Sequence, residues 1–159
     1  MTQKQFDDLY NKSREERVPL DVHGEDLSGL KLEKKDLINA NFTNAICRET
    51  NFIECLLCAA NFTGADITHA RVYFSDANGA VFDNAKCKGI SFHDVKLREA
   101  SFRNANLSGS YFRDGTDVYH ATFKGADISY CKCGGIKNAD DSDFFYGPGR
   151  DTGASMSYF

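Results

Sequence analysis

The chain lacks the features that mark several common protein classes. It has no Trp, two Pro and two Met among 159 residues, whereas Phe is abundant at 13. The longest uncharged apolar run, residues 55–60, is far shorter than the roughly 20 residues that span a bilayer. The polar N-terminal segment MTQKQFDDLYNKSREER resembles neither a signal peptide nor a transit peptide. We therefore expect a cytoplasmic protein with no membrane partner.

Charge and composition narrow the function further. The net charge is −4, and this mild acidity argues against direct nucleic-acid binding, which needs a basic surface. The hydrophobic fraction is 42%, which suffices for one folded domain with one core.

A repeat of five residues runs through most of the chain. From residue 40 it reads ANFTN, AICRE, TNFIE, CLLCA, ANFTG, ADITH, with a small first residue, an apolar third residue and polar residues elsewhere. A period of five fits neither an α-helix nor a flat strand. Four such units would close one four-sided coil, and the third position of every fourth unit indeed reads Phe42, Phe62, Phe82, Phe102 and then Phe123. The first position on the same side reads Ala40, Ala60, Ala80, Ala100 and Ala121.

One residue interrupts this regular spacing. The step from Phe102 to Phe123 is longer by a single residue than the steps before it, and we assign the extra residue to Gly115. The same step taken again reaches Phe144, which predicts a further coil and a second single-residue insertion near residues 138–141.

The repeat resembles that of the pentapeptide repeat family. ANFTG, ADITH, ANLSG and ADISY match its A(D/N)LxX motif closely. The resemblance implies an all-β fold, a right-handed quadrilateral β-helix, in which the first and third residues of each unit point inward. We divide the chain into a capping helix and linker (1–24), a solenoid of about six coils (25–146) and a tail or cap (147–159).

Both ends of a solenoid need covering. Thr2 and Gln5 form a capping-box pattern, and Phe6, Leu9 and Tyr10 share one face, so we expect a helix over residues 3–16 that lies across the first coil. The alternative is a frayed polar arm. Aromatic residues near the C-terminus could cover the last coil or join two protomers, since related proteins often dimerise end to end.

Catalytic, metal and cofactor sites are not expected. The repeat places Cys47, Cys87 and Cys133 at third positions and Cys55 and Cys131 at first positions, where all five should be buried, and only Cys58 faces outward. The four His residues fall on different sides and coils, and no nucleotide-binding or nucleophile motif is present. A packed solenoid interior offers no pocket, so we expect a protein that is not an enzyme.

The least ordinary surface is apolar. Ile53, Leu56, Cys58, Tyr73 and Phe74 occupy outward or corner positions that are otherwise polar. Their clustering across coils predicts a site for a protein partner. The alternative is that the N-terminal helix or another local segment covers them.

A second candidate surface lies near the C-terminus. Asp140, Asp141, Asp143, Phe145 and Tyr146 could form an acidic or dimer-forming face. Quinolone-resistance members of the family resemble B-form DNA and bind DNA gyrase, which requires an acidic face. No side of this repeat carries a strong acidic stripe, and the most negative holds Asp36, Asp76 and Asp117.

The sequence therefore favours a non-enzymatic module that docks on and modulates another protein, as an adaptor, an immunity factor or a phage-type inhibitor. The alternative is a DNA mimic that binds a topoisomerase or another DNA-binding enzyme.

Overall fold

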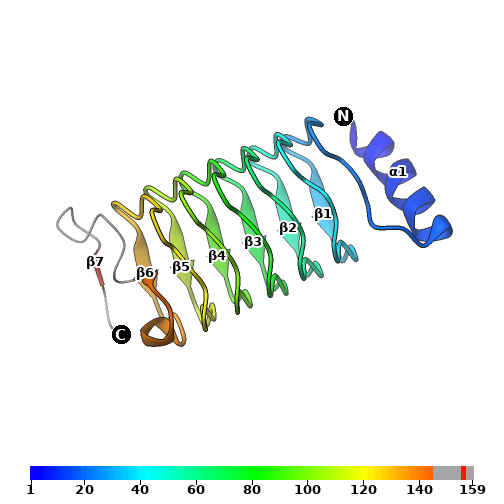
Figure 1. Ribbon diagram of the computed structural model, residues 1–159. Helices are drawn as coiled ribbons and strands as arrows, with labels where there is room; N and C mark the ends of the chain where they lie inside the picture. Colours follow the sequence, from blue (N-terminus) through cyan, green and yellow to red (C-terminus); the bar gives the residue numbers. More distant parts are fainter. Residues whose placement is uncertain (145–154, 157–159) are drawn as a thin grey trace.

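Stacked coils of backbone form a rod that is covered at one end by a helix (Figure 1). The computed structural model describes residues 1–144 and 155–156. Its elements, in chain order, are α1 (Gln3–Glu16), β1 (Lys31–Glu33), β2 (Asn51–Ile53), β3 (Arg71–Tyr73), β4 (Ser91–His93), β5 (Tyr111–Arg113), β6 (Lys132–Gly134), the 3₁₀ helix η1 (Ala139–Asp141) and β7 (Ser155–Met156).

The strands form one parallel sheet in the order of the chain. From β1 to β5 the register is constant and joins each residue to its equivalent in the next coil, as in Phe52 against Val72. Between β5 and β6 the register gains a single residue, with Phe112 against Cys133. Gly115, whose φ of 90° suits glycine, lies between these strands, so the predicted slip is confirmed.

Three further rows of parallel bridges run alongside the sheet, so each coil has four sides. We name the four sides after their residues. The strand side carries β1–β6, the Asp76 side carries Asp76 with its row neighbours Leu56 and Lys96, and the Asp66 side carries Asp66 with Ile46 and Lys86. The Phe side carries the Phe column, which consists of Phe42, Phe62, Phe82, Phe102 and Phe123. The predicted quadrilateral β-helix with a short N-terminal helix is confirmed. Coil pairing already begins at Asp21, within the expected linker, and the division of the chain into three segments stays a prediction.

The axis of the rod holds one continuous column of aromatic rings, with further aromatic and aliphatic side chains around it. On the Phe side, successive rings stack with centroids 4.5–5.0 Å apart and planes within 6° of parallel, from Phe42 to Phe123. The inward residues of the strand side include Phe52, Phe92 and Phe112, whose rings lie nearly perpendicular to those of this column. All of these rings are buried, so the column forms one continuous core.

Helix α1 closes the first coil. The predicted capping box is present, with Thr2 and Gln5 bonded reciprocally. Phe6 is fully buried against the core, and the Tyr10 hydroxyl accepts a hydrogen bond from the Asp36 N–H at 3.0 Å. Ion pairs of Asp7 with Lys35 and of Arg14 with Asp36 hold the helix in place. The expected helix over residues 3–16 is therefore confirmed, and the frayed arm is excluded.

The last described coil is incomplete. Helix η1 lies where the second insertion was expected, and the bridges on the Asp76 side end at Lys137. Phe144 reaches the end of the Phe column as predicted, but its ring meets Phe123 edge-on at 4.7 Å and 87° rather than stacking. Cys133 is half-buried rather than buried, which corrects the expectation for that residue. Among the described residues, only the two residues of β7 pair with the outer edge of β6, so little of the described chain covers Cys133.

Candidate protein-binding surface

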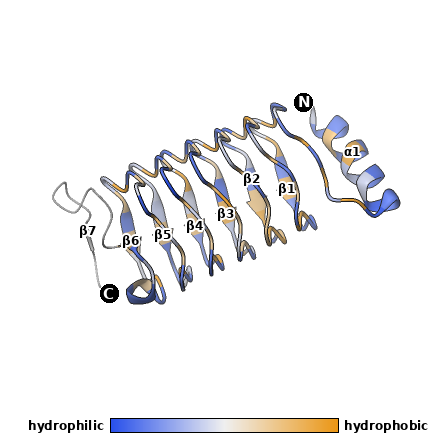
Figure 2. Cartoon of the chain, viewed as in Figure 1, coloured by the Kyte–Doolittle hydropathy of each residue, from blue (hydrophilic) through white to orange (hydrophobic). Residues whose placement is uncertain are grey.

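Five outward side chains form what we call the apolar patch: Ile53, Leu56, Cys58, Tyr73 and Phe74. Ile53 and Tyr73 are direct neighbours on β2 and β3, and Phe74 occupies the corner where the strand side meets the Asp76 side. Leu56 is 46% exposed and Phe74 is 54% exposed, while the other three are half-buried. Figure 2 shows hydrophobic colouring on β2.

Phe74 combines a left-handed backbone conformation with a large exposed side chain. Its φ is 52°, in the left-handed region that corner residues of the coil adopt. Gly and Asn fill many of these corners, because a side chain with a Cβ costs roughly 1–2 kcal/mol in this conformation. A bulky aromatic residue is therefore an expensive choice for the fold at this position. Strain of this kind tends to persist where function requires the side chain.

His93 completes the aromatic surface around Phe74. Its ring lies 5.2 Å from the Phe74 ring and 5.6 Å from the Tyr73 ring. Its Nδ1 lies 3.0 Å from a carboxylate oxygen of Asp114, which fixes the ring orientation. The sequence prediction missed this histidine, although its position one coil after Tyr73 places it directly beside that ring.

Helix α1 leaves the apolar patch uncovered. Within the described part of the chain, its hydrogen bonds and ion pairs to the solenoid end on Lys31, Lys35 and Asp36, all in the first coils. The alternative in which α1 covers the patch therefore finds no support in these contacts.

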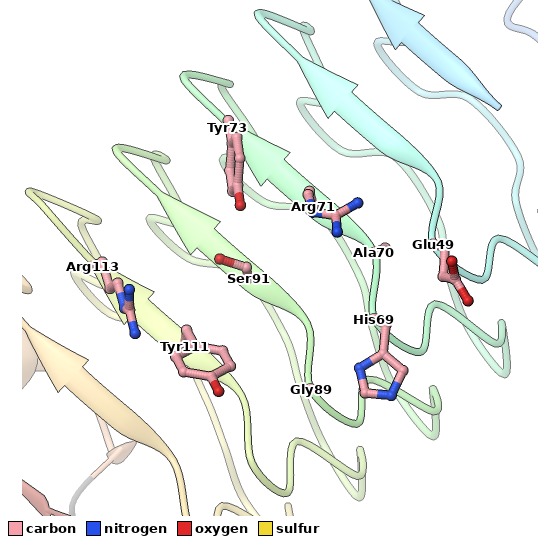
Figure 3. A pocket seen from close by; sticks show the side chains of 9 residues that line it. All are labelled: Glu49, His69, Ala70, Arg71, Tyr73, Gly89, Ser91, Tyr111 and Arg113. Carbon is pink, nitrogen blue, oxygen red and sulfur yellow. The ribbon is translucent and has the colours of Figure 1, made fainter. Parts of the chain in front are cut away.

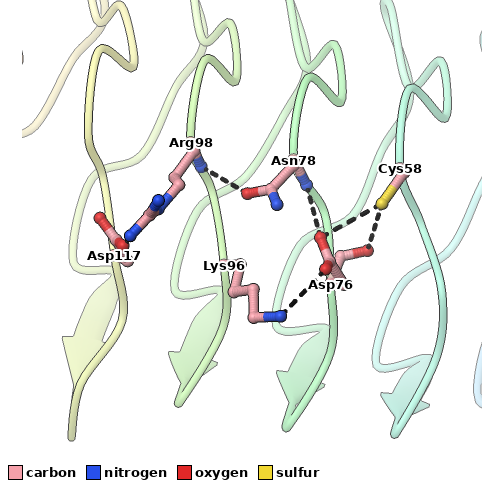
Figure 4. A network of polar contacts seen from close by, with 6 residues as sticks. All are labelled: Cys58, Asp76, Asn78, Lys96, Arg98 and Asp117. Atoms are coloured by element: carbon pink, nitrogen blue, oxygen red, sulfur yellow. Dashed lines mark hydrogen bonds and ion pairs between the residues drawn. The ribbon is translucent and has the colours of Figure 1, made fainter.

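A polar network borders the patch on the Asp76 side (Figure 4). Asp76 accepts hydrogen bonds from the Cys58 thiol at 3.2 Å and from the Asn78 N–H at 3.2 Å, and it pairs with Lys96 at 3.3 Å. Burial alone would raise the pKa of Asp76, but these donors outweigh that effect and hold the pKa below its ordinary value. The carboxylate is thus charged and fully engaged at neutral pH.

Cys58 is poorly suited to act as a nucleophile. Burial and the neighbouring Asp76 carboxylate both raise the pKa of its thiol, so the reactive thiolate is disfavoured. Its role in the patch is that of a small apolar side chain whose thiol donates to Asp76.

Comparison with known proteins identifies the fold family. A family model described as "Pentapeptide repeats" matches in eight copies, within residues 26–57, 36–72, 45–84 and 78–114. The chain belongs to the pentapeptide repeat family. A search of curated proteins gave no significant match.

Solved structures of other pentapeptide repeat proteins share the fold. Rfr23 from the cyanobacterium Cyanothece 51142 is 16% identical, with a TM-score of 0.59 over 86% of this chain and 97% of that one. A trypsin-treated QnrB1, a plasmid-mediated fluoroquinolone resistance protein, is 20% identical, with a TM-score of 0.55 over 76% and 71%. At these identities the similarity concerns the fold.

The remaining cysteines of this pentapeptide repeat protein fill its interior. Cys47, Cys55, Cys87 and Cys131 are buried and unpaired. Burial raises the pKa of Cys55 to about 11 and that of Cys131 to about 12, so these thiols stay protonated. Among residues 1–144 and 155–156, no group of three or more His, Cys, Asp or Glu side chains is arranged to hold a metal ion. In the same part of the chain, no helix is long and apolar enough to cross a membrane.

The second candidate surface is only partly within the described residues. Asp140 and Asp141 are exposed on η1. Asp143 is engaged in the structure, since it accepts hydrogen bonds from the Phe123 N–H and, at 2.8 Å, from the Thr122 hydroxyl. Phe145 and Tyr146 lie outside the described residues.

Carboxylates on two sides of the rod form ion pairs with basic residues of neighbouring coils. On the Asp66 side, Arg48 bonds Asp66 at 2.7 Å, and on the Asp76 side, Arg98 bonds Asp117 at 2.7 Å. Because each pair joins neighbouring coils, the negative charge does not accumulate along the rod as it does along a DNA backbone.

Proposed function

We propose that this pentapeptide repeat protein is a non-enzymatic module that binds another protein through the apolar patch. The observation that carries the proposal is the exposed Phe74 ring together with the rings of Tyr73 and His93 that lie against it. Exposed aromatic and aliphatic side chains that cluster in this way are typical of the centres of protein interfaces.

The surroundings of the patch suit a docking surface. Leu56 and Phe74 present apolar area, while the engaged carboxylate of Asp76 and the His93–Asp114 pair supply a polar rim. The backbone beneath is held on both sides by neighbouring coils, so a partner would meet a preorganised face. Adaptors, immunity factors and phage-type inhibitors of host enzymes all act through such docking. We propose a cytoplasmic setting for this activity.

The test compares two double variants in affinity capture from the native host. Leu56→Asp with Phe74→Asp places two charges in the patch. The matched control, Val18→Asp with Tyr130→Asp, changes one aliphatic and one aromatic residue that are 49% and 66% exposed elsewhere in the chain. We expect partners captured by the parent to be lost with the patch variant and retained with the control. If the patch variant stays folded and captures the same proteins as the parent, the proposal is wrong.

The second candidate function is a DNA mimic that binds DNA gyrase or another DNA-binding enzyme. The shared fold with QnrB1 and the exposed Asp140 and Asp141 favour it. The cross-coil ion pairs of Asp66, Asp76 and Asp117 oppose it. A gyrase supercoiling assay separates the two candidates, because a mimic should inhibit or protect the enzyme at micromolar concentration, whereas the proposed module should have no effect.

We further propose that the C-terminal end, including Phe145 and Tyr146, joins two protomers. Sedimentation of the full chain against a Phe145→Asp, Tyr146→Asp variant tests this separately from the patch. A dimer that persists in the variant would contradict it.

A further inference from the structure

A groove crosses the outer face of β3, β4 and β5 beside the apolar patch (Figure 3). Its volume is about 520 Å³. Ser91 lies at its centre, directly between Arg71 on the preceding coil and Tyr111 on the next. The small Ser91 side chain leaves a depression between these longer neighbours. Tyr73 of the apolar patch forms part of the same wall, so groove and patch are continuous.

The corner next to Ser91 keeps the groove open. Gly89 has a φ of 65°, and a Cβ there would collide with the ring of His69. Glycine therefore allows the His69 ring to lie along the edge of the groove. A larger residue at either Gly89 or Ser91 would fill the space that the neighbouring coils enclose.

The charge of the groove is opposite to that of the whole chain. Arg71 and Arg113 line it and are both exposed, and Glu49 is the single carboxylate in its lining. Within the described residues, neither arginine forms an ion pair. Arg71 Nη1 donates to Asn51 Oδ1 at 3.3 Å, and the Arg113 guanidinium lies 4.6 Å from the centre of the Tyr111 ring. Both arginines are thus oriented by neutral neighbours, and their charges remain available.

We propose that this groove binds an acidic segment of the protein partner, with one carboxylate of the segment paired with Arg71 and another with Arg113. Guanidinium groups form strong charge-assisted hydrogen bonds with carboxylates, and the Tyr73 and Tyr111 rings flank the same space. Arg71 on β3 and Arg113 on β5 are two coils apart and offset by two residues along the strand, so their Cα atoms lie ~12 Å apart at the usual strand spacing and rise. Acidic side chains on one face of an extended segment, two or four residues apart, could reach both. The inference rests on the proposed function only in taking the occupant to be part of a protein partner.

The probe is acetyl-hexaglutamate amide, titrated into the ¹⁵N-labelled full chain at low salt and followed by amide chemical shifts. We expect saturable shifts at residues 89–91 and in β3–β5, and their loss at high salt. The double variant Arg71→Glu, Arg113→Glu should raise the Kd for the peptide at least about tenfold. Arg103→Glu, an exposed arginine on the Phe side, should leave binding unchanged, and hexaglutamine should cause no shifts.

Three outcomes would overturn the inference. These are the absence of saturable shifts, equal weakening by Arg103→Glu, or the same shifts with a thymidine hexanucleotide at equal or higher affinity, which would indicate a phosphate-backbone ligand. A Leu56→Ser, Phe74→Ser variant, which removes apolar area from the patch without adding charge beside the groove, separates this test from that of the proposed function. It should keep hexaglutamate binding while losing the partner, so either idea can fail while the other stands.

Discussion

The carboxylate of Asp143 takes the place of a backbone carbonyl above Phe123. In the earlier coils, the N–H of each Phe-column residue donates to a carbonyl of the next coil, as Phe82 does to Ser101 and Phe102 to Thr122. The N–H of Phe123 instead donates to Asp143 Oδ1, while Asp143 Oδ2 accepts from the Thr122 hydroxyl at 2.8 Å. One side chain thereby ends the hydrogen-bond ladder of the Phe side.

Removal of this cap should destabilise the C-terminal end. Asp143→Ala leaves the Phe123 N–H without its acceptor, which should lower the free energy of unfolding by about 1–3 kcal/mol. Asp143→Asn keeps one carbonyl oxygen and should cost less. Urea unfolding followed by circular dichroism measures both. Asp140→Ala, at an exposed carboxylate of η1, is the control, and equal losses in Asp143→Ala and Asp140→Ala would contradict the capping role.

The left-handed backbone conformation of Phe74 should lower the free energy of unfolding, and a glycine at this position should relieve the strain. Because its φ is 52°, Phe74→Gly should be about 1 kcal/mol more stable than Phe74→Ala, which keeps the strain and loses the ring. Both variants should lose partner capture. Urea midpoints give the comparison. An alanine variant as stable as the glycine variant would show that this corner is not strained.

The ion pair of Arg48 with Asp66 should make stability depend on pH in the acid range. Burial opposes ionisation of Asp66, but the hydrogen bonds from Arg48 and Thr68 outweigh it and lower the pKa. Above the unfolded-state pKa of about 3.9, Asp66 is charged in both states and the pair stabilises the fold. As the pH falls through the lower folded-state pKa, this stabilisation is lost.

Arg48→Met should therefore raise the native pKa of Asp66 and lower stability at pH 7 more than at pH 2. A carboxyl titration by NMR, with urea unfolding between pH 2 and 7, tests both expectations. Arg103→Met is the control, since Arg103 forms no ion pair within the described residues. Parallel stability curves for the two variants would contradict the role of the pair.

Helix α1 should protect the first coil from pairing with other chains. Phe6 is fully buried, and Phe6→Asp would place an uncompensated charge at that position. We expect the helix to detach, and the exposed backbone edge of the first coil to promote oligomers. Light scattering coupled to size exclusion would detect them. The control variant Lys4→Asp, on the exposed face of α1, should keep the molar mass of the parent. A Phe6→Asp variant with the molar mass of the parent would contradict this role of the helix.

Much of this fold could be predicted because the same residue type, and not only the same polarity, recurs at equivalent core positions of successive coils. The Phe column and the extra residue at Gly115 follow from counting, and the capping box follows from Thr2 and Gln5. The half-burial of Cys133 could not be predicted, because it depends on how much of the next coil is formed. The cap at Asp143 depends on where the chain leaves the solenoid, which the repeat does not encode.

The candidate site was predicted less completely. The patch residues stand out because apolar side chains occupy polar positions of the repeat. The groove arises from the contrast in size between Ser91 and its neighbours on adjacent coils, together with the direction of Arg71 and Arg113. Side-chain direction on an outer face is set by local contacts, such as the stacking of Arg113 on Tyr111, that a linear pattern does not contain.

The pairing of each coil with its immediate neighbours has a consequence for how the rod comes apart. Hydrogen bonds between coils join each residue to the coil before or after its own, so a terminal coil is held on one side and an inner coil on two. Melting of such an array begins at its ends and moves inward. The patch on β2 and β3 and the groove on β3–β5 belong to the inner coils. A chain that frays at both termini would still present its binding face intact, and amide protons beneath Phe74 and Ser91 should exchange last.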